Sequence, residues 1–424
     1  MTAQTEPSLE VLQRKVRTVL ILGQIMAGLG VGATLSMGAI LAGRISGSDA
    51  LSGMAATMAT LGAALAAVPL AALASRTGRS ISLASGASVA ALGGVVVIIA
   101  IVADSFALLL LGLMMVGVGT AVNLQSRFAA TDLAAPKTRG RDLSLVVWAT
   151  TVGAVTGPNL LTPGESLGSW LGLPELAGPF VFTVVAQVLA AVVYLVGLRP
   201  DPLKVAKAAA SAHAVAGTPP ALADVVDRPI VQRAAMLAIA LSHATMVSVM
   251  AMTPVHLVNH GASLAIVGFT ISLHIAGMYA LSPVFGILAD RVGRIPTILL
   301  GQAVFGIGLA FTGFGSENEL AVVMGLVLLG LGWSASTVAG STLLSESTSL
   351  ARRAKVQGVS DLLMSGSGAT GAALAGVVLS FFGYGGLSYV AVAFVLVVTV
   401  RIVFLARAEL PVAKSAHAAA TYEI

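Results

Sequence analysis

The sequence contains no cysteine, which excludes a disulfide, a thiolate metal site and thiol redox chemistry within this chain. Charged side chains are also scarce, because Asp, Glu, Lys and Arg make up 10% of the 424 residues, whereas a soluble domain carries about 25%. So few charges cannot cover a water-exposed surface, so most of the surface must face lipid. A nucleotide-binding loop of the G-x-x-x-x-G-K-[S/T] type is absent too, which argues against an ATP-driven pump, and we expect no enzymatic activity.

Long apolar runs are the main feature of the sequence. A helix needs about 20 mainly apolar residues to span a bilayer, and twelve such stretches can be counted. Their centres lie near Gly30, Leu61, Val95, Met114, Thr151, Ala186, Met246, Ser272, Gly306, Val327, Gly368 and Phe394. The sequence therefore predicts an all-α membrane protein with twelve transmembrane helices.

An internal repeat divides the predicted helices into two halves. The run Arg76–Arg79 reads R-T-G-R, and the run Arg291–Arg294 reads R-V-G-R, 215 positions later. Three further pairs match at a spacing of 214 positions: Asp132 with Glu346, Arg139 with Arg353, and Gly157 with Gly371. We therefore predict two six-helix bundles, at residues 18–198 and 230–406, joined by a cytoplasmic linker at 199–229. Membrane proteins built from such parallel repeats bind a solute between the halves near the bilayer midplane.

Basic residues are distributed asymmetrically about the predicted helices. When the chain is threaded from a cytoplasmic N-terminus, Arg44 is the only Lys or Arg outside the cytoplasmic ends and loops. This pattern places both tails, 1–17 and 407–424, in the cytoplasm and favours a multi-pass protein of the inner membrane. The net charge of +5 then reflects topology rather than nucleic-acid binding. All 18 Asp and Glu fall in loops or at helix ends in this threading, and we expect the chain to work as a monomer.

The run Gly286–Arg294 resembles the loop signature of the major facilitator superfamily, G-x-x-x-D-R-x-G-R. Gly286 allows two helices to approach closely, and Asp290 is expected to face the N-terminus of a neighbouring helix, whose dipole favours an anion. The copy in the first half is weaker, because Ala71 replaces the glycine and Ser75 replaces the aspartate. The resemblance implies the two-bundle transporter fold and a conformational role, rather than a substrate-binding one, for these loops.

The polar cytoplasmic side is predicted to form a gate that closes the inner mouth. The residues assigned to it are Arg76, Gly78, Arg79, Asp132, Arg139, Arg141, Gly286, Asp290, Arg291, Gly293 and Arg294. The cluster around Asp132 also contains Asn123, Gln125 and Arg127. Binding of the solute by this cluster is the alternative interpretation.

Histidine and methionine are concentrated in the predicted seventh and eighth helices. His243, Met246 and Met250 share one face of the seventh helix, and His274 and Met278 share one face of the eighth. Thioether and imidazole donors without a carboxylate suit Cu(I), and neutral Met carries no charge to desolvate in a membrane helix. His256 and His260, near the outer mouth, are placed to capture the ion first. The alternative is packing, because Met often fills gaps between helices and Met54 and Met58 repeat the spacing elsewhere.

This combination resembles the CcoA-type copper importers, which carry M-x-x-x-M in the seventh helix and H-x-x-x-M in the eighth. The matching residues are Met246 with Met250 and His274 with Met278. The resemblance implies copper uptake into the cytoplasm in support of haem-copper oxidase assembly, with copper as the transported substrate and no permanent cofactor. The chain departs from the family in lacking the cysteines that also contribute there. Close relatives of that branch import riboflavin, so riboflavin or another small organic solute stays open.

A third function is suggested by the fifth helix. Gly153, Gly157 and Pro158 resemble the G-x-x-x-G-P motif of drug/proton antiporters in the same superfamily. The spacing also suits a packing hinge, because small residues four apart allow close helix packing and proline bends a helix. An exporter of cationic drugs would need a buried acid to exchange a proton for the charge of the drug. Because the threading places none in mid-membrane, export of a drug or metabolite is the weaker alternative.

Overall fold

The computed structural model describes residues 9–47, 51, 54–216 and 227–421. Every regular element in this part of the chain is a helix. The helices are α1 (Leu9–Ser46), α2 (Met54–Thr77), α3 (Arg79–Val102), α4 (Phe106–Ala129), α5 (Arg139–Asn159), α6 (Leu161–Trp170), α7 (Gly178–Gly197), α8 (Pro202–Ala216), α9 (Pro229–Asn259), α10 (Leu264–Tyr279), α11 (Ser282–Arg291), α12 (Arg294–Phe314), α13 (Glu319–Glu346) and α14 (Leu350–Thr421). The all-α prediction is confirmed.

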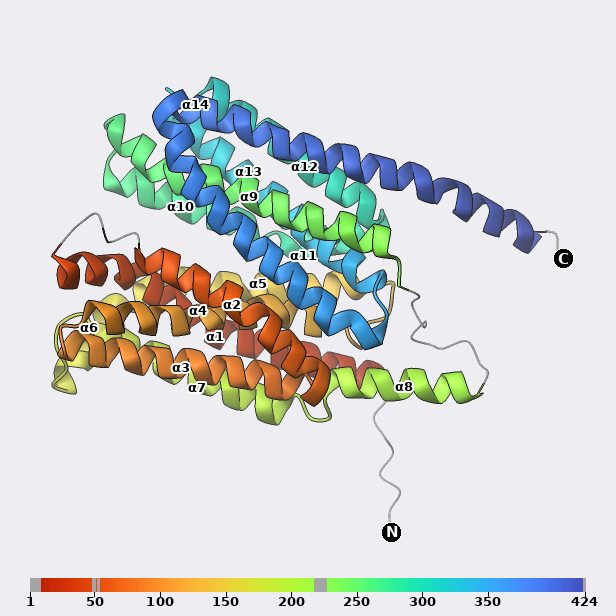
Figure 1. Ribbon diagram of the computed structural model, residues 1–424, viewed down its shortest axis with the longest axis horizontal. Coiled ribbons are helices and arrows are strands. Elements are labelled where there is room, and N and C mark those ends of the chain that lie inside the picture. Colours follow the sequence, from red (N-terminus) through yellow and green to blue (C-terminus); the bar gives the residue numbers. More distant parts are fainter. Residues whose placement is uncertain (1–8, 48–50, 52–53, 217–226, 422–424) are drawn as a thin grey trace, which may run out of the picture.

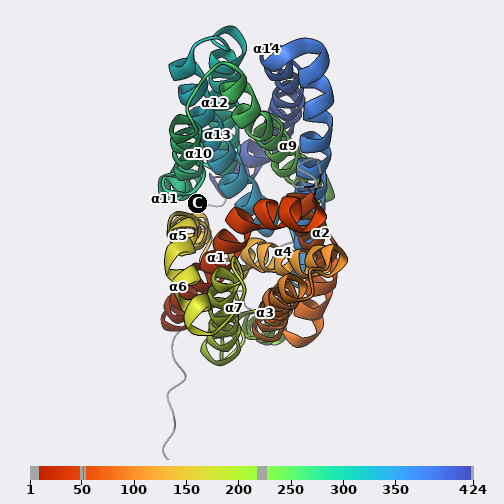
Figure 2. The same ribbon diagram turned by 90° about the vertical axis from the view of Figure 1, so that its left-hand side faces the viewer.

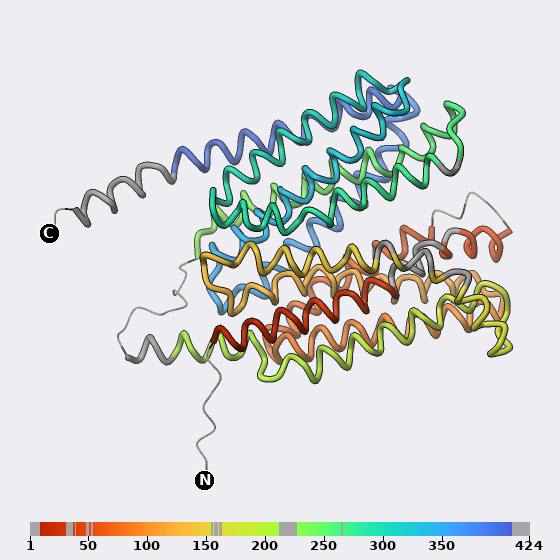
Figure 3. Tube along the Cα trace, turned by 180° about the vertical axis from the view of Figure 1, so that it is seen from behind, coloured from red at the N-terminus to blue at the C-terminus, as the bar shows by residue number. Residues whose placement is uncertain are grey.

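The helices form two bundles that lie side by side along the long axis of the molecule. Figure 1 shows α1–α7 in the lower bundle and α9–α14 in the upper one, and Figure 2 shows both from one end. Short breaks interrupt several of the helices. Gly383 has φ of 67° inside α14, where the chain turns back and joins two helices, and α5 and α6 meet at Leu160. The tube in Figure 3 follows both bundles from behind.

The surface of the described helices is suited to lipid. Among the described residues, nine helical stretches are long and apolar enough to cross a membrane, where α7 runs on into α8 and α10 into α11 as single stretches. Large apolar side chains are exposed on their outer faces, such as Leu65, Val196 and Phe404, which agrees with a mean hydropathy of +0.96. The membrane architecture is therefore as predicted, and the count of twelve spans stays a prediction.

The segment between the bundles contains a helix. α8 lies at one end of the molecule, at the right of Figure 1, and that side is called the α8 end below. Just before α8, the Asp201 Oδ2 atom accepts a hydrogen bond of 2.8 Å from the Ser80 backbone N–H at the start of α3. The chain can approach this carboxylate closely because Gly78 has no Cβ and has φ of 102°. The remaining linker, 217–226, lies outside the described residues, and α14 continues helically through most of the predicted tail 407–424.

Candidate functional site

Asp290 connects the two bundles at the α8 end. Its Oδ1 and Oδ2 atoms accept hydrogen bonds from the backbone N–H groups of Gly140, at 2.9 Å, and Arg141, at 2.8 Å. α5 begins at Arg139, so these N–H groups belong to its first turn and have no partner within the helix. The carboxylate thus lies at the positive end of the helix dipole, and the expected position of Asp290 is confirmed.

Glycine permits the close contact between α11 and α5. A Cβ atom on Gly286 would overlap Ser144 Oγ and would lie 2.6 Å from the Gly140 carbonyl oxygen. The contact related by the repeat, between α2 and α14, has Ala71 in place of this glycine. There the glycine is on the other helix, because a Cβ on Gly358 would overlap the Ala71 Cβ. Each of the two close contacts between the bundles therefore depends on at least one glycine.

Two ion pairs within the bundles follow the sequence repeat. Arg79 Nε lies 2.8 Å from Asp132 Oδ2, and Arg294 Nη2 lies 2.7 Å from Glu346 Oε1. Arg294 Nη2 also lies 3.1 Å from Asp290 Oδ1. The repeat therefore gives each bundle its own arginine–carboxylate pair at the α8 end.

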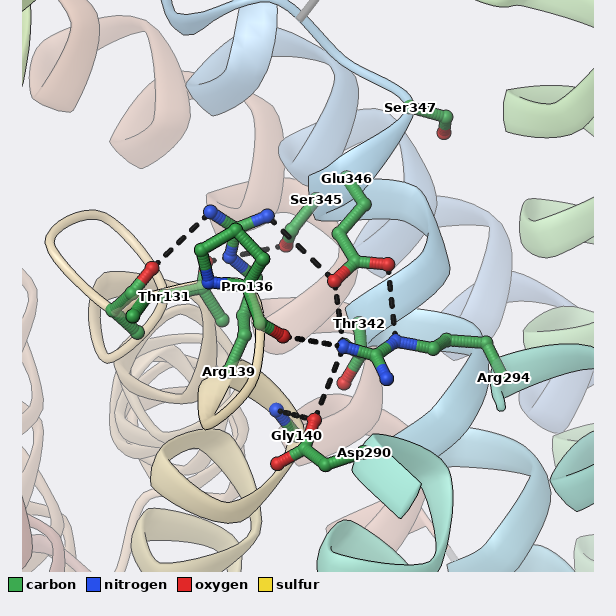
Figure 4. A network of polar contacts seen from close by, with 12 residues as sticks. Thr131, Pro136, Arg139, Gly140, Asp290, Arg294, Thr342, Ser345, Glu346 and Ser347 are labelled. Carbon is green, nitrogen blue, oxygen red and sulfur yellow. Dashed lines mark hydrogen bonds and ion pairs between the residues drawn. The ribbon is translucent and has the colours of Figure 1, made fainter. Parts of the chain in front are cut away.

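The same two carboxylates also face arginines of the opposite bundle. Arg139 Nη1 lies 3.7 Å from Glu346 Oε1, and Arg353 Nη1 lies 4.0 Å from Asp132 Oδ1. Because Arg139 corresponds to Arg353 and Asp132 to Glu346 in the repeat, these two contacts are reciprocal. Figure 4 shows Arg139, Glu346, Arg294 and Asp290 in one connected network. The charges that hold each bundle together therefore also hold the bundles to each other.

Not every residue predicted for the gate is in this network. Arg76, Arg141 and Arg291 are exposed, although the Arg141 backbone N–H binds Asp290. Gly293 has φ of 112° at the turn before α12, a conformation that favours glycine. The gating role itself stays a prediction for the whole set.

A further ion pair between the bundles was missed by sequence reasoning. Arg127 Nη2, on α4, lies 2.7 Å from Asp361 Oδ1, on α14, and both side chains are almost completely buried. The expectation that every Asp and Glu lies in a loop or at a helix end is wrong for Asp361. α14 begins at Leu350, so Asp361 lies eleven residues inside the helix, or about 16 Å along its axis. The polar segment before it looked like a loop, but its side chains pair with the opposite bundle, as Gln357 does with Arg79 at 2.6 Å.

One ring nitrogen of His274 has a hydrogen-bond partner, and the other has none among the described residues. Its Nδ1 atom lies 2.7 Å from the Leu326 carbonyl oxygen on α13, and a carbonyl only accepts, so Nδ1 carries the proton. Nε2 is buried and has no hydrogen-bond partner among the described residues. The close packing depends on Gly330, where a Cβ would lie 2.5 Å from the His274 carbonyl oxygen. Metal-binding histidines typically donate one ring N–H to such a carbonyl while the other nitrogen binds the metal.

The predicted methionine ligands lie in the C-terminal bundle, where Met246 and Met278 are buried and Met250 is half-buried. Met246 and Met278 belong to one apolar cluster, which also includes Leu326, and Met250 packs against it. None of the three is a fully exposed, lipid-facing side chain. The thioethers of Met246 and Met278 thus lie in the same cluster as Leu326. The carbonyl oxygen of Leu326 accepts the hydrogen bond from His274. This burial suits both a ligand set and ordinary packing.

His243 differs from His274, because its Nδ1 atom accepts a hydrogen bond from an aromatic side chain. The Trp333 indole N–H donates to this nitrogen at 3.0 Å, and a Cβ on Gly368 would lie 2.8 Å from its Nε2. Tyr279 packs edge-on against Trp333, with ring centroids 5.5 Å apart. Sequence reasoning missed this aromatic row, because its members come from three separate helices.

His256 and His260 lie at the end opposite α8, in an open pocket of about 440 Å³ at the end of α9. His256 stacks on Tyr384 and its Nε2 donates to the Ser316 carbonyl oxygen at 2.7 Å. His260 Nδ1 donates to the His256 carbonyl oxygen, and its Nε2 lies 3.3 Å from Glu317 Oε2. In the described part of the chain, no group of three His, Asp or Glu side chains is arranged to hold a metal ion. Metal capture by these histidines stays a prediction.

The proposed hinge in α5 is only partly described. A Cβ on Gly153 would lie 2.6 Å from the Gly28 Cα atom, so this glycine allows close packing of α5 on α1. The surroundings of Gly157 and Pro158 lie outside the described side chains. α5 ends at Asn159, directly after this proline.

Comparison with known proteins agrees with this architecture. The family model of the Major Facilitator Superfamily matches residues 20–260 and 235–421. The chain is 39% identical over 380 residues to the uncharacterized MFS-type transporter YddS of Bacillus subtilis (strain 168), covering 88% of this chain and 86% of that protein. It is 28% identical over 377 residues to the riboflavin transporter RfnT of Brucella anthropi, covering 88% and 90%. The crystal structure of the human organic anion transporter MFSD10 has the same fold, with a TM-score of 0.73 and 18% identity over 94% of this chain and 100% of that one. The chain therefore belongs to the Major Facilitator Superfamily of membrane transporters.

Proposed function

We propose that this transporter imports copper, as Cu(I) or weakly complexed copper, across the inner membrane by alternating access and supplies haem-copper oxidase assembly. In this proposal, twelve helices span the membrane and both termini lie in the cytoplasm. The α8 end then faces the cytoplasm. The network around Asp290 and Glu346 then acts as the inner gate, which is closed here. Opening this gate releases the ion inside.

One observation carries the choice of copper. The Nε2 lone pair of His274 is buried and unpartnered within the described structure, while its Nδ1–H is fixed on a carbonyl. Met246 and Met278 lie in the adjoining cluster and offer thioether sulfurs. Soft neutral donors of this kind favour Cu(I) over Mg²⁺ or Ca²⁺. A set with few ligands and no thiolate also suits a carrier, which must release its ion.

The test is copper accumulation in a host without its own high-affinity copper uptake. We expect the wild-type chain to restore accumulation, and Met246→Ala or His274→Ala to lower the initial uptake rate at least about tenfold, which corresponds to about 1.4 kcal/mol. Met252→Ala is the matched control, because Met252 also lies on α9 and packs against the same cluster without belonging to the predicted set. Wild-type rates in both variants, at equal protein level in the membrane, would refute copper binding at this position.

A flat organic solute of the riboflavin class is the second candidate. It is favoured by the similarity to RfnT and by the row of Tyr279, Trp333 and His243, whose rings offer stacking surfaces. Riboflavin uptake is measured in the same strains. Uptake that requires Trp333 and tolerates His274→Ala would support this candidate and contradict copper transport. Sensitivity to drugs on deletion would instead support export, because Asp361 is a buried acid of the kind that such export needs.

A further inference from the structure

The C-terminal half of the repeat supplies two carboxylates for two arginines at the α8 end. Arg294 binds both oxygens of Glu346, at 2.7 and 3.0 Å, and its Nη2 also lies 3.1 Å from Asp290 Oδ1. Arg139, from the opposite bundle, lies 3.7 Å from the same Glu346. The positive and negative charges of this group are therefore equal in number.

The group related to it by the repeat has two arginines but one carboxylate. Asp132 accepts two hydrogen bonds from Arg79, at 2.8 and 3.3 Å, and lies 4.0 Å from Arg353 Nη1. The position that corresponds to Asp290 is Ser75, whose neutral hydroxyl donates to a backbone carbonyl of its own helix. Among the described residues, this group thus carries one positive charge in excess.

The excess charge belongs to Arg353. Its side chain is only 3% exposed, and its Nε atom is buried with no hydrogen-bond partner in the described part of the chain. The charged groups that face it are Asp132, Glu346, Arg79 and Arg139, and each of the two carboxylates already binds another arginine through both oxygens. An arginine keeps its charge in a protein, and a buried charge without a full partner is strongly unfavourable. The closed gate would therefore be stabilised by a negative charge beside Arg353.

We propose that a small monovalent anion, with the size and charge of chloride, binds beside Arg353 and stabilises the closed inner gate. The excess is a single charge on an almost completely buried guanidinium, which favours a small monovalent ion over a phosphate or a nucleotide. The anion enters from the solution at the α8 end while the bundles are apart, and it is enclosed when they close. The inference goes beyond the transport function proposed above, because it does not depend on the identity of the solute.

The test measures the distance between the bundles as a function of chloride, without any solute. The cysteine-free chain is labelled with spin probes at Lys137→Cys and Val292→Cys, two exposed positions on opposite bundles at the α8 end. In lipid nanodiscs, gluconate is replaced by chloride at constant ionic strength, so that screening of the surface charges stays the same. With a Kd of about 10 mM for the closed state, the ratio of short to long distances rises about tenfold at about 100 mM chloride. Chloride should also raise the Tm of the unlabelled chain, a readout that responds even when the closed state already dominates.

Two pairs of variants make the test specific. Ser75→Asp supplies the missing carboxylate four residues before Arg79, where the two side chains pair along the helix, so this variant should stay closed in gluconate and ignore chloride. Ser75→Asn has the same size without the charge and should keep the wild-type response. Arg353→Gln removes the excess charge and should also ignore chloride. Lys355→Gln, which changes an exposed cation on the same helix, should respond like the wild type.

The outcomes separate this proposal from that of copper transport. A distance ratio and a Tm that are equal in chloride and gluconate would overturn the anion site, as would a wild-type response in Ser75→Asp. A chloride response lost equally in Lys355→Gln would also contradict it, because the effect would then not belong to Arg353. The buffers contain no copper, so failure of the copper proposal leaves these results unchanged. A failure of transport itself appears separately, as a chain that closes with chloride but accumulates no solute.

Discussion

The hydrogen bonds from α5 to Asp290 allow a quantitative test of the inner gate. Asp290→Asn keeps the size of the side chain but removes its charge and one of its two acceptor oxygens. The backbone N–H of either Gly140 or Arg141 then loses its partner, while Arg294 keeps Glu346. The change therefore weakens the contact between the bundles without leaving an arginine unpaired.

The expected magnitude follows from the two interactions that are lost. A hydrogen bond to a charged group contributes about 1.5–3 kcal/mol, and a carboxylate at a helix N-terminus contributes about 0.3–1 kcal/mol more. The closed state should thus lose about 2–4 kcal/mol relative to the open one. Since about 1.4 kcal/mol equals a factor of ten, the open population rises about thirtyfold at the lower figure.

Alkylation of a single cysteine measures this population. Ser345 is buried between the bundles, where its Oγ lies 3.2 Å from Thr131 Oγ1. Ser345→Cys in the cysteine-free chain should react with a maleimide only when the α8 end opens. In this background, Asp290→Asn should raise the alkylation rate about thirtyfold or more.

The control uses another aspartate at a helix start. Asp227 accepts a hydrogen bond from the Ser349 backbone N–H just before α14, at 3.0 Å, but the two residues lie at the starts of helices of the same bundle, α9 and α14. Asp227→Asn should leave the alkylation rate unchanged. The account of the gate is refuted if Asp290→Asn changes the rate less than about threefold, or if Asp227→Asn changes it equally.

Two further predictions concern packing and pH. Gly286→Ala places a methyl group against Ser144 and should also raise alkylation at Ser345→Cys, whereas Gly306→Ala, which meets open space, should not. The second concerns Asp227: burial alone would raise its pKa, but hydrogen bonds from Ser349, Arg352 and Gln232 outweigh it and lower the pKa below its usual value. Its stabilising contribution is therefore complete above about pH 4 and is lost as the pH falls through the lowered pKa. Thermal unfolding should show a smaller acid-induced loss in Asp227→Asn than in the wild type.

Much of the fold and of the gate could be predicted because their causes are local in the sequence. Apolar runs give the helices, and the nine-residue signature ending at Arg294 gives both the glycine contact and the carboxylate at a helix start. The repeat also aligned Asp132 with Glu346 and Arg139 with Arg353 before any contact was known. The repeat could not predict that Arg139 faces Glu346 and that Arg353 faces Asp132, because these contacts depend on how the two bundles pack.

The remaining site residues could not be predicted, since their partners lie far away in the sequence. Trp333 meets His243 across 90 positions, and Arg127 meets Asp361 across 234. Asp361 follows a polar stretch that is typical of a loop. In the structure this stretch is helical, and Gln357 and Asp361 on it bind arginines of the opposite bundle.

The most direct test of copper transport uses the purified chain in sealed proteoliposomes. Initial uptake of radioactive copper is measured under reducing conditions, for the wild type, His274→Ala and Met252→Ala, with empty liposomes as the blank. We predict saturable uptake by the wild type and by Met252→Ala, and none above the blank by His274→Ala. Wild-type uptake equal to the blank, or equal rates in all three proteins, would contradict the proposal that these soft donors carry copper.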